Sequence, residues 1–178
     1  RERFLSDALI EVSGSGVSRY RFESEKWTDM TFLLRFRTAS PSLRAGRFVL
    51  RTDWVGQRVQ TAADPLSLGG DNGIRGYSSQ HFLSFGGNRL RGNVEFRSKP
   101  IRLGPFYSGA VAFYDAGALY GGSRNSGYIH SVGIGARGLL PQASSYTYRL
   151  DFGVPLNGSG FMMTLKGGTL TLETNQGV

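Results

Sequence analysis

Apolar and polar side chains alternate along most of this chain, with a period of two residues. In 89–97, for example, the apolar residues Leu90, Val94 and Phe96 are separated by charged or polar ones. Because successive side chains of a strand point to opposite faces, this pattern predicts strands with one apolar and one polar face. The same alternation, clear or partial, occurs in 29–37, 47–54, 106–119, 128–140, 145–156 and 161–170. A glycine-broken stretch, 5–22, predicts one more long strand or a hairpin.

Turn signals separate the predicted strands. They are the dipeptides Ser40-Pro41, Lys99-Pro100, Gly104-Pro105, Gly121-Gly122, Leu140-Pro141 and Asn157-Gly158. Their spacing predicts about eight strands joined as an antiparallel meander. Neither a helix nor a linker is expected, so residues 1–178 are predicted to form one all-β domain.

The alternation alone does not say which face points to water, because a soluble sandwich or a lipocalin alternates too. Three features favour a membrane barrel with its apolar face outward. The strands have the roughly 9–11 residues that a tilted membrane-spanning strand requires. Opposite charges are mixed on the polar face, as where Glu95 lies between Arg91 and Arg97. Aromatic residues, typical of interfacial girdles, collect near strand ends at Tyr20, Phe22, Trp27, Trp54, Phe106, Tyr107, Tyr120, Tyr128 and Tyr146.

In this interpretation the charged face lines a water-filled lumen. Slipping one strand by a residue would move its arginines into lipid, at a cost of roughly 2–4 kcal/mol each near the midplane. The register of the strands is therefore expected to be strongly fixed. The predicted lumen-facing charges are Arg35, Arg37, Arg47, Arg51, Arg91, Arg97, Arg137 and Arg149.

Composition is compatible with this class. The chain has 26 Gly, 12 Phe, 8 Tyr and 2 Trp, and 39% of its residues are hydrophobic. No apolar stretch reaches about 18 residues, so no transmembrane helix is predicted. With no Cys, neither a disulfide nor a thiolate metal site is possible. Residues 1–10 lack both an apolar signal core and an initiator Met, so we expect a mature or truncated chain whose targeting segment lies upstream.

A net charge of +8 would suit nucleic acid or an anionic membrane surface. The basic residues, however, occupy every second position within strands and do not form a block. Aromatic residues and arginines also fall on opposite faces, which argues against a single-stranded nucleic-acid site. No nucleic-acid partner is therefore expected.

A long connection, 61–87, joins two of the predicted strands and is far longer than a hairpin needs. It contains the glycine-rich run 68–77, in which glycines permit positive φ and close backbone approach. Arg75, near the end of this run, presents a planar guanidinium that can bind a carboxylate through two hydrogen bonds.

The run ends in Ile74-Arg75-Gly76-Tyr77, and Phe113-Tyr114-Asp115-Ala116-Gly117 follows downstream. Between them lies Asn93-Val94-Glu95-Phe96-Arg97, and the runs 131–137 and 149–156 come later. In this order, over about residues 46–170, the sequence resembles the superfamily of BamA and the two-partner-secretion transporters. The resemblance rests on two motifs, each in a matching strand context.

The resemblance implies that 61–87 folds into the lumen and that Arg75 contacts acidic residues of the inner wall. By the family's motif these would be Asp115, in the strand that also carries Phe113 and Gly117, with Glu95 nearby. The alternation agrees, because Glu95 lies on the charged face and Asp115 has the parity of Phe113 and Gly117.

The resemblance further implies a barrel of sixteen strands, of which this chain would form the C-terminal half. The expected location is the bacterial outer membrane or the outer membrane of an endosymbiont-derived organelle. The implied function is to insert outer-membrane proteins or to secrete a partner polypeptide. Two alternatives remain open: a barrel that anchors an upstream enzyme such as a patatin-like lipase, and a soluble lipocalin-like carrier.

Enzymatic chemistry is not expected on this chain. It has no Gly-x-Ser-x-Gly nucleophile motif, and His81 and His130 lack acidic or Cys neighbours at metal-ligand spacing. The glycine run 69–76 lacks the Gly-Lys-Ser/Thr ending of a phosphate-binding loop. We therefore predict no catalytic residue, no metal and no cofactor.

Geometry also predicts that the chain does not close on itself. An eight-stranded barrel is filled by its own side chains, so it cannot also hold eight arginines and a folded loop. Open edges in lipid would leave backbone groups unpaired at several kcal/mol each. Either upstream strands or a second copy should therefore pair with the edges near 5–22 and 161–170. The other expected partners are outer-membrane lipid and a client or secreted polypeptide.

Overall fold

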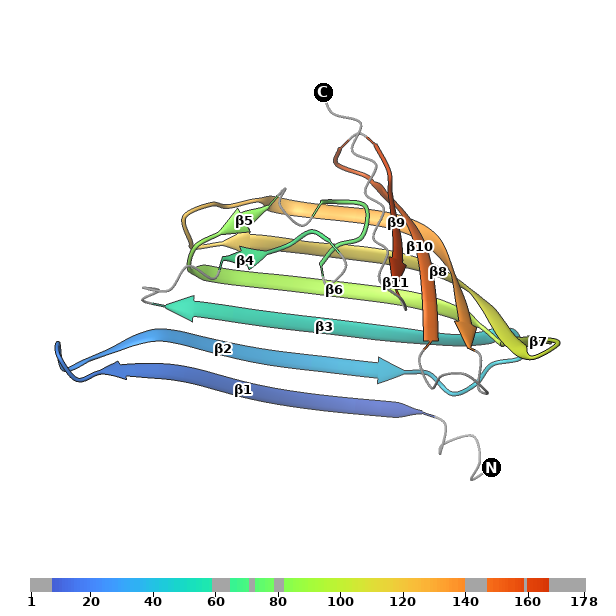
Figure 1. Cartoon of the computed structure of the whole chain (residues 1–178), viewed down its shortest axis with the longest axis horizontal. Coiled ribbons are helices and arrows are strands. Elements are labelled where there is room, and N and C mark those ends of the chain that lie inside the picture. Colours follow the sequence, from blue (N-terminus) through green and yellow to red (C-terminus); the bar gives the residue numbers. More distant parts are fainter. Residues whose placement is uncertain are drawn as a thin grey trace.

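The computed structural model describes residues 8–58, 65–70, 73–78, 82–139, 147–158 and 160–166. Over this part of the chain the fold is all-β (Figure 1), and no helix long and apolar enough to cross a membrane is present. The strands are β1 (Leu9–Arg21), β2 (Lys26–Ala39), β3 (Gly46–Arg58), β4 (Leu66–Ser67), β5 (Leu83–Ser84), β6 (Gly87–Ser98), β7 (Ile101–Leu103), β8 (Phe106–Tyr120), β9 (Gly127–Leu139), β10 (Thr147–Pro155) and β11 (Met162–Lys166).

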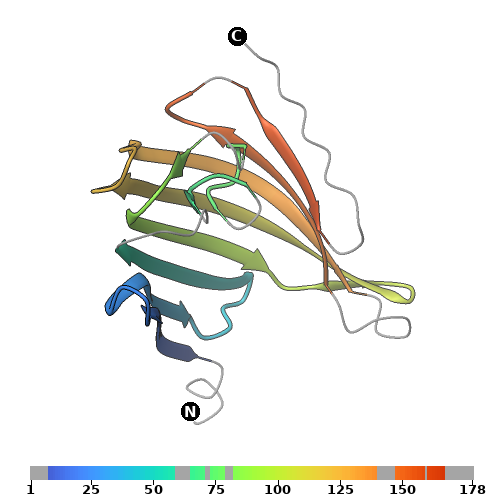
Figure 2. The same cartoon turned by 60° about the vertical axis from the view of Figure 1, so that its left-hand side comes forward.

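One antiparallel sheet contains nine of these strands, in the order β1-β2-β3-β6-β8-β9-β10-β11, with β7 paired to β8. Apart from the short inserts, each strand pairs with its neighbour in the sequence, as predicted for a meander. Figure 2 shows the sheet curving around the short paired strands β4 and β5, both of which belong to the long connection. The sheet is not closed: β1 and β11 are its two edges, which agrees with the prediction that the chain does not close on itself.

Several details differ from the sequence prediction. The stretch predicted as 5–22 is described from residue 8 and forms the single strand β1, which was one of the two options. β7 was not predicted, because Lys99-Pro100 and Gly104-Pro105 were both interpreted as turns. Pro100 directly precedes β7, which pairs on one side only, where a proline is tolerated. The predicted strand residues 5–7, 140, 145–146 and 167–170, and the turn at 140–141, lie outside the described residues.

The two faces of the sheet have opposite character. In β8 the odd-numbered residues from Val111 to Leu119 are buried, whereas the even-numbered residues between them are more exposed. On the convex face large apolar side chains are exposed, for example Val12 at 73% and Ile134 at 65%. Others are Phe32, Leu34, Phe48, Leu90, Val94, Val132, Phe152 and Val154. The charged residues Glu95, Asp115 and Asp151 are buried on the concave face, which reverses the usual arrangement of a soluble sheet.

A small apolar core lies between the long connection and the concave face. Leu68, Ile74 and Tyr77 of the connection pack there with residues of β3, β8 and β9. The whole core consists of Val55, Leu66, Leu68, Ile74, Tyr77, Leu119 and Ile129. The connection is therefore held against the sheet by apolar packing as well as by the polar contacts described next.

Candidate functional site

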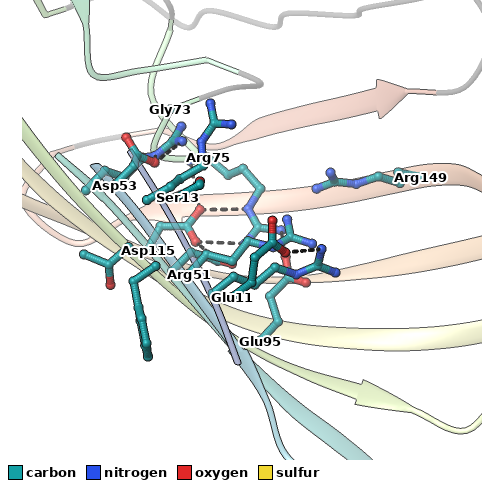
Figure 3. A pocket seen from close by; sticks show the side chains of 15 residues that line it. Glu11, Ser13, Arg51, Asp53, Gly73, Arg75, Glu95, Asp115 and Arg149 are labelled. Atoms are coloured by element: carbon teal, nitrogen blue, oxygen red, sulfur yellow. Dashed lines mark hydrogen bonds and ion pairs between the residues drawn. The ribbon is translucent and has the colours of Figure 1, made fainter. Parts of the chain in front are cut away.

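The loop around Arg75 is folded tightly by its own backbone. The amide of Ile74 donates to the carbonyl of Leu68 at 2.7 Å, and the amide of Gly70 donates to the carbonyl of Tyr77 at 2.7 Å. A Cβ on Gly73 would lie only 2.2 Å from the carbonyl oxygen of Leu68, so glycine is required at that position. The turn points the Arg75 side chain toward the concave face of the sheet (Figure 3).

Arg75 is buried and donates to carboxylates on three different strands. Its Nε and Nη2 bind the two oxygens of Asp115 at 2.7 and 2.8 Å, the planar two-bond geometry of an arginine–carboxylate pair. Its Nη1 donates to Glu95 at 2.9 Å and to Asp151 at 3.2 Å. Its backbone amide adds a bond to Asp115 at 3.1 Å. Four of the five N–H groups of the guanidinium thus donate to carboxylates on β6, β8 and β10.

The electrostatics keep Arg75 charged. Burial by itself lowers the pKa of the guanidinium, because the charged form loses hydration. The hydrogen bonds and charge of Asp115, followed by the charges of Glu95 and Asp151, outweigh burial and raise the pKa of Arg75 above its usual value. At any physiological pH this residue is therefore a permanent cation at the centre of three carboxylates.

Further polar groups complete the network around the carboxylates. Arg97 donates to Glu95 at 2.5 and 2.8 Å. Asp151 accepts from Arg137 at 2.5 Å and from Arg149 at 2.9 Å. The amide of Asn93 donates to Asp115. Three carboxylates and three guanidinium groups of the sheet therefore surround the guanidinium group of Arg75 and hold it in a fixed position.

Small residues make room for this network. The guanidinium carbon of Arg75 lies 3.4 Å from the ring centroid of Phe113, a cation–π contact. That ring occupies the space over Gly133, where a Cβ would be 2.2 Å from it. Gly135 is equally required, because a Cβ there would lie 2.1 Å from an oxygen of Asp151.

The loop backbone also comes close to the sheet at one contact between two glycines. Gly76 has a φ of +97° and lies against Gly153 of β10, where a Cβ would be only 2.7 Å from the Gly76 nitrogen. Gly117 likewise leaves space for Ile74 and Leu68, whose side chains would be 3.1 and 3.0 Å from a Cβ there. The motif Ile74-Arg75-Gly76-Tyr77 therefore fits β8 and β10 by shape as well as by charge.

Tyr77 closes the loop on its other side. Its hydroxyl donates to the backbone carbonyl of His130 in β9 at 3.3 Å. Burial raises the pKa of this phenol, because the phenolate would lose hydration. The side chain is thus a neutral donor that ties the end of the motif to the sheet.

The structure brings together the predicted loop motif, its wall partners and some of the predicted lumen-facing charges. Arg75, Asp115, Glu95, Phe113 and Gly117 all meet at one place, and Arg97, Arg137 and Arg149 surround them. Arg91 belongs to a second cluster, in which it and Arg89 bind Asp53. Arg35, Arg37, Arg47 and Arg51 do not join either cluster within the described residues. His81 lies outside the described residues.

Sequence reasoning missed several members of the site, Asp151 above all. Asp151 has the same parity as Arg149 and Gly153 and so was expected on the polar face, but parity does not say which polar residues meet across strands. The register does: Asp151 lies opposite Gly135, and Glu95 lies opposite Phe113. The other members that were missed are Asn93, Asp53, Gly133, Gly135 and Gly153.

Chemically, the arrangement is suited to holding a loop in place. Among the described residues, no group of three His, Asp or Glu side chains is placed to hold a metal ion. The three carboxylates instead all bind Arg75 of the loop. The chain matches no protein-family model, and no curated protein or solved structure is significantly similar to it.

Proposed function

We propose that this chain is the C-terminal half of an outer-membrane β-barrel that inserts other outer-membrane proteins or secretes a partner polypeptide. The observation that carries the proposal is the combination of an apolar convex face with a loop bound by buried charges on the concave face. This is the arrangement that the resemblance to the BamA and two-partner-secretion superfamily implies.

The convex face is suited to lipid. Monomeric soluble proteins rarely expose large contiguous apolar patches. Here, however, the outward side chains of the six neighbouring strands β2, β3, β6, β8, β9 and β10 are mostly aliphatic or aromatic. The strands β1, β2 and β8 have 13, 14 and 15 residues, which is more than the roughly 9–11 needed to cross at a tilt. A soluble lipocalin-like carrier would instead have its apolar face inside.

Aromatic side chains gather at the loop end of the sheet, as an interfacial girdle requires. Tyr20 of β1 lies directly opposite Trp27 of β2. On the neighbouring strands, Trp54 donates its indole hydrogen to the hydroxyl of Tyr120 at 3.1 Å. Such side chains place an apolar ring toward the acyl chains and a polar group toward the headgroups.

The concave face supports a role in handling polypeptides. A locked loop inside a charged lumen leaves a water-filled path whose width depends on where the loop lies. We call Arg75 together with Asp115, Glu95 and Asp151 the lock. It joins the loop to strands β6, β8 and β10, so a change at any of these strands would alter the position of the loop. This couples the wall of the barrel to the contents of the lumen.

The test is made in the cells that carry the protein. The chain should fractionate with the outer membrane, resist extraction by alkaline carbonate and need detergent for solubility. Cells whose only copy is Arg75→Ala should lose outer-membrane proteins or a secreted polypeptide, whereas the exposed Arg44→Ala should not. Recovery of the protein in the soluble fraction without detergent, or normal assembly and secretion in the Arg75→Ala cells, would overturn the proposal.

A further inference from the structure

A groove of about 350 Å³ opens on the concave face between the loop and strands β1 to β3 (Figure 3). One side is formed by Gly73 and Arg75 of the loop, and the other by Glu11 and Ser13 of β1. Its floor carries the side chains of β2 and β3 that the lock does not use, including Arg35, Arg37 and Arg51. At about 30 Å³ per water molecule, the groove is much larger than one phosphate group needs.

Two arginines of this floor have no acidic partner among the described residues, and the third has only a long ion pair. Arg35 and Arg51 make neither a hydrogen bond nor an ion pair with the described residues, and Arg37 has only a distant one, 3.9 Å from Glu11. The Nε of Arg37 is buried without a partner. The remaining acids of the groove are occupied, because Asp53 binds Arg89 and Arg91 while Glu95 and Asp115 belong to the lock.

The register brings these like charges together. Arg37 of β2 lies directly opposite Arg51 of β3. Arg35 is two residues further along the same face, opposite Asp53, whose carboxylate binds Arg89 and Arg91. Like charges directly opposite each other in a sheet are destabilising. The repulsion between Arg37 and Arg51 lowers the stability of the protein without a ligand, and a bound anion would replace this repulsion with attraction.

We propose that this groove binds the side-chain carboxylates of an extended, acidic segment of a polypeptide. The inference deepens the proposed function, on which it rests, by naming the chemical class of segment that the lumen accepts. Guanidinium groups bind carboxylates in a planar geometry with two hydrogen bonds, and three such groups face the groove.

Spacing favours an extended polypeptide over a single small anion. Residues two apart on a strand are separated by about 6.6 Å, so Arg35 and Arg37 are one strand repeat apart on the same face. An extended acidic segment carries carboxylates at that same repeat on one of its faces. A lone phosphate reaches Arg37 and Arg51 together but leaves Arg35 unpaired.

The experiment measures binding of a fluorescent peptide of alternating Asp and Ser to the protein in detergent micelles. The expected result is saturable binding that weakens as ionic strength rises, with little binding of the matching Asn and Ser peptide. Arg51→Gln should weaken binding about tenfold or more, because it removes a charge-assisted bond. Arg44→Gln, with the same change of charge on an exposed residue outside the groove, should bind as the parent does.

Folding does not confound the comparison, because Arg51→Gln removes like-charge repulsion and should leave the melting temperature unchanged or higher. Arg51→Lys should restore part of the affinity. Inorganic phosphate serves as the competing small anion. If phosphate binds and is lost in Arg51→Gln while the peptide does not bind, the groove is a small-anion site and the inference is wrong. Equal peptide binding by Arg51→Gln and Arg44→Gln overturns it too.

The test of the groove and the test of the proposed function can fail separately. Peptide binding is measured on purified protein and does not require membrane integration or secretion in cells. A protein that is located in the outer membrane but does not bind the acidic peptide would contradict only the inference about the groove. A protein found to be soluble would contradict the proposed function, whatever the peptide does.

Discussion

Arg75 is a cation that has lost its water and depends on Asp115, Glu95 and Asp151 to replace it. In a buried ion pair the Coulomb gain and the loss of hydration largely cancel, so the intact network adds little net stability. Removing one partner is different, because the charges left behind stay buried without compensation. The role of this residue is therefore seen most clearly when it is deleted.

We expect Arg75→Ala to destabilise the protein by roughly 3–5 kcal/mol, the usual cost of breaking a buried pair from one side. Arg75→Lys should fall in between, because one ammonium group cannot form the planar fork to Asp115. Equilibrium unfolding by urea in micelles measures both effects. Arg44→Ala, an exposed control, should stay within about 0.5 kcal/mol. A similar small change for Arg75→Ala would mean that the network does not stabilise the fold.

The glycine contact can be tested without changing any charge. In Gly153→Ala the added methyl would lie 2.7 Å from the Gly76 nitrogen, so the loop must move away from β10, at a cost of about 1–3 kcal/mol. Trypsin should then cleave after Arg75 faster than in the parent protein. Gly92→Ala in β6, where a Cβ meets nothing within 4 Å, is the matched control. Equal cleavage rates in the two variants would contradict the close fit.

At the scale of elements, the period of two predicted the long strands because each of them has one apolar and one polar face. β4, β5 and β7 are only two or three residues long, too short for any periodicity to be seen. The pair of Arg75 and Asp115 could be predicted from a motif together with parity. Asp151 could not be selected, because its place beside Arg75 depends on the register of β8, β9 and β10, which no local pattern contains.

The apolar convex face predicts a depth-dependent response to charge. Ile134 lies near the middle of β9 and is 65% exposed, whereas Tyr128 lies near the start of the same strand. In a bilayer, Ile134→Arg should cost roughly 2–4 kcal/mol and Tyr128→Arg about 0–1 kcal/mol. Folding into lipid vesicles at a series of urea concentrations gives both values. In a soluble protein both arginines would lie in water, and the two variants should differ little.

At the scale of the whole molecule, β1 and β11 are the two edges of the sheet over the described residues. An edge strand that has no partner exposes backbone amides and carbonyls, which can pair with another strand. On the concave side, the loop and its lock occupy the space that a self-closed sheet would need for its own side chains. The edges and the contents of the concave face thus lead to the same expectation, that further strands complete the barrel.

Cysteines placed at the two edges report what those strands contact, and the natural chain contains none that would interfere. In a protein carrying Val12→Cys in β1 and Met163→Cys in β11, oxidation should yield links between chains or to strands outside this chain. A disulfide requires Cα atoms within about 7 Å, which the two edges of an open sheet do not offer each other. As a control, Ala112→Cys with Ile134→Cys joins directly opposed residues of β8 and β9 and should link within one chain. Efficient formation of the 12–163 disulfide inside a monomer would show that the sheet closes on itself, and the loop would then have to lie outside the enclosed space.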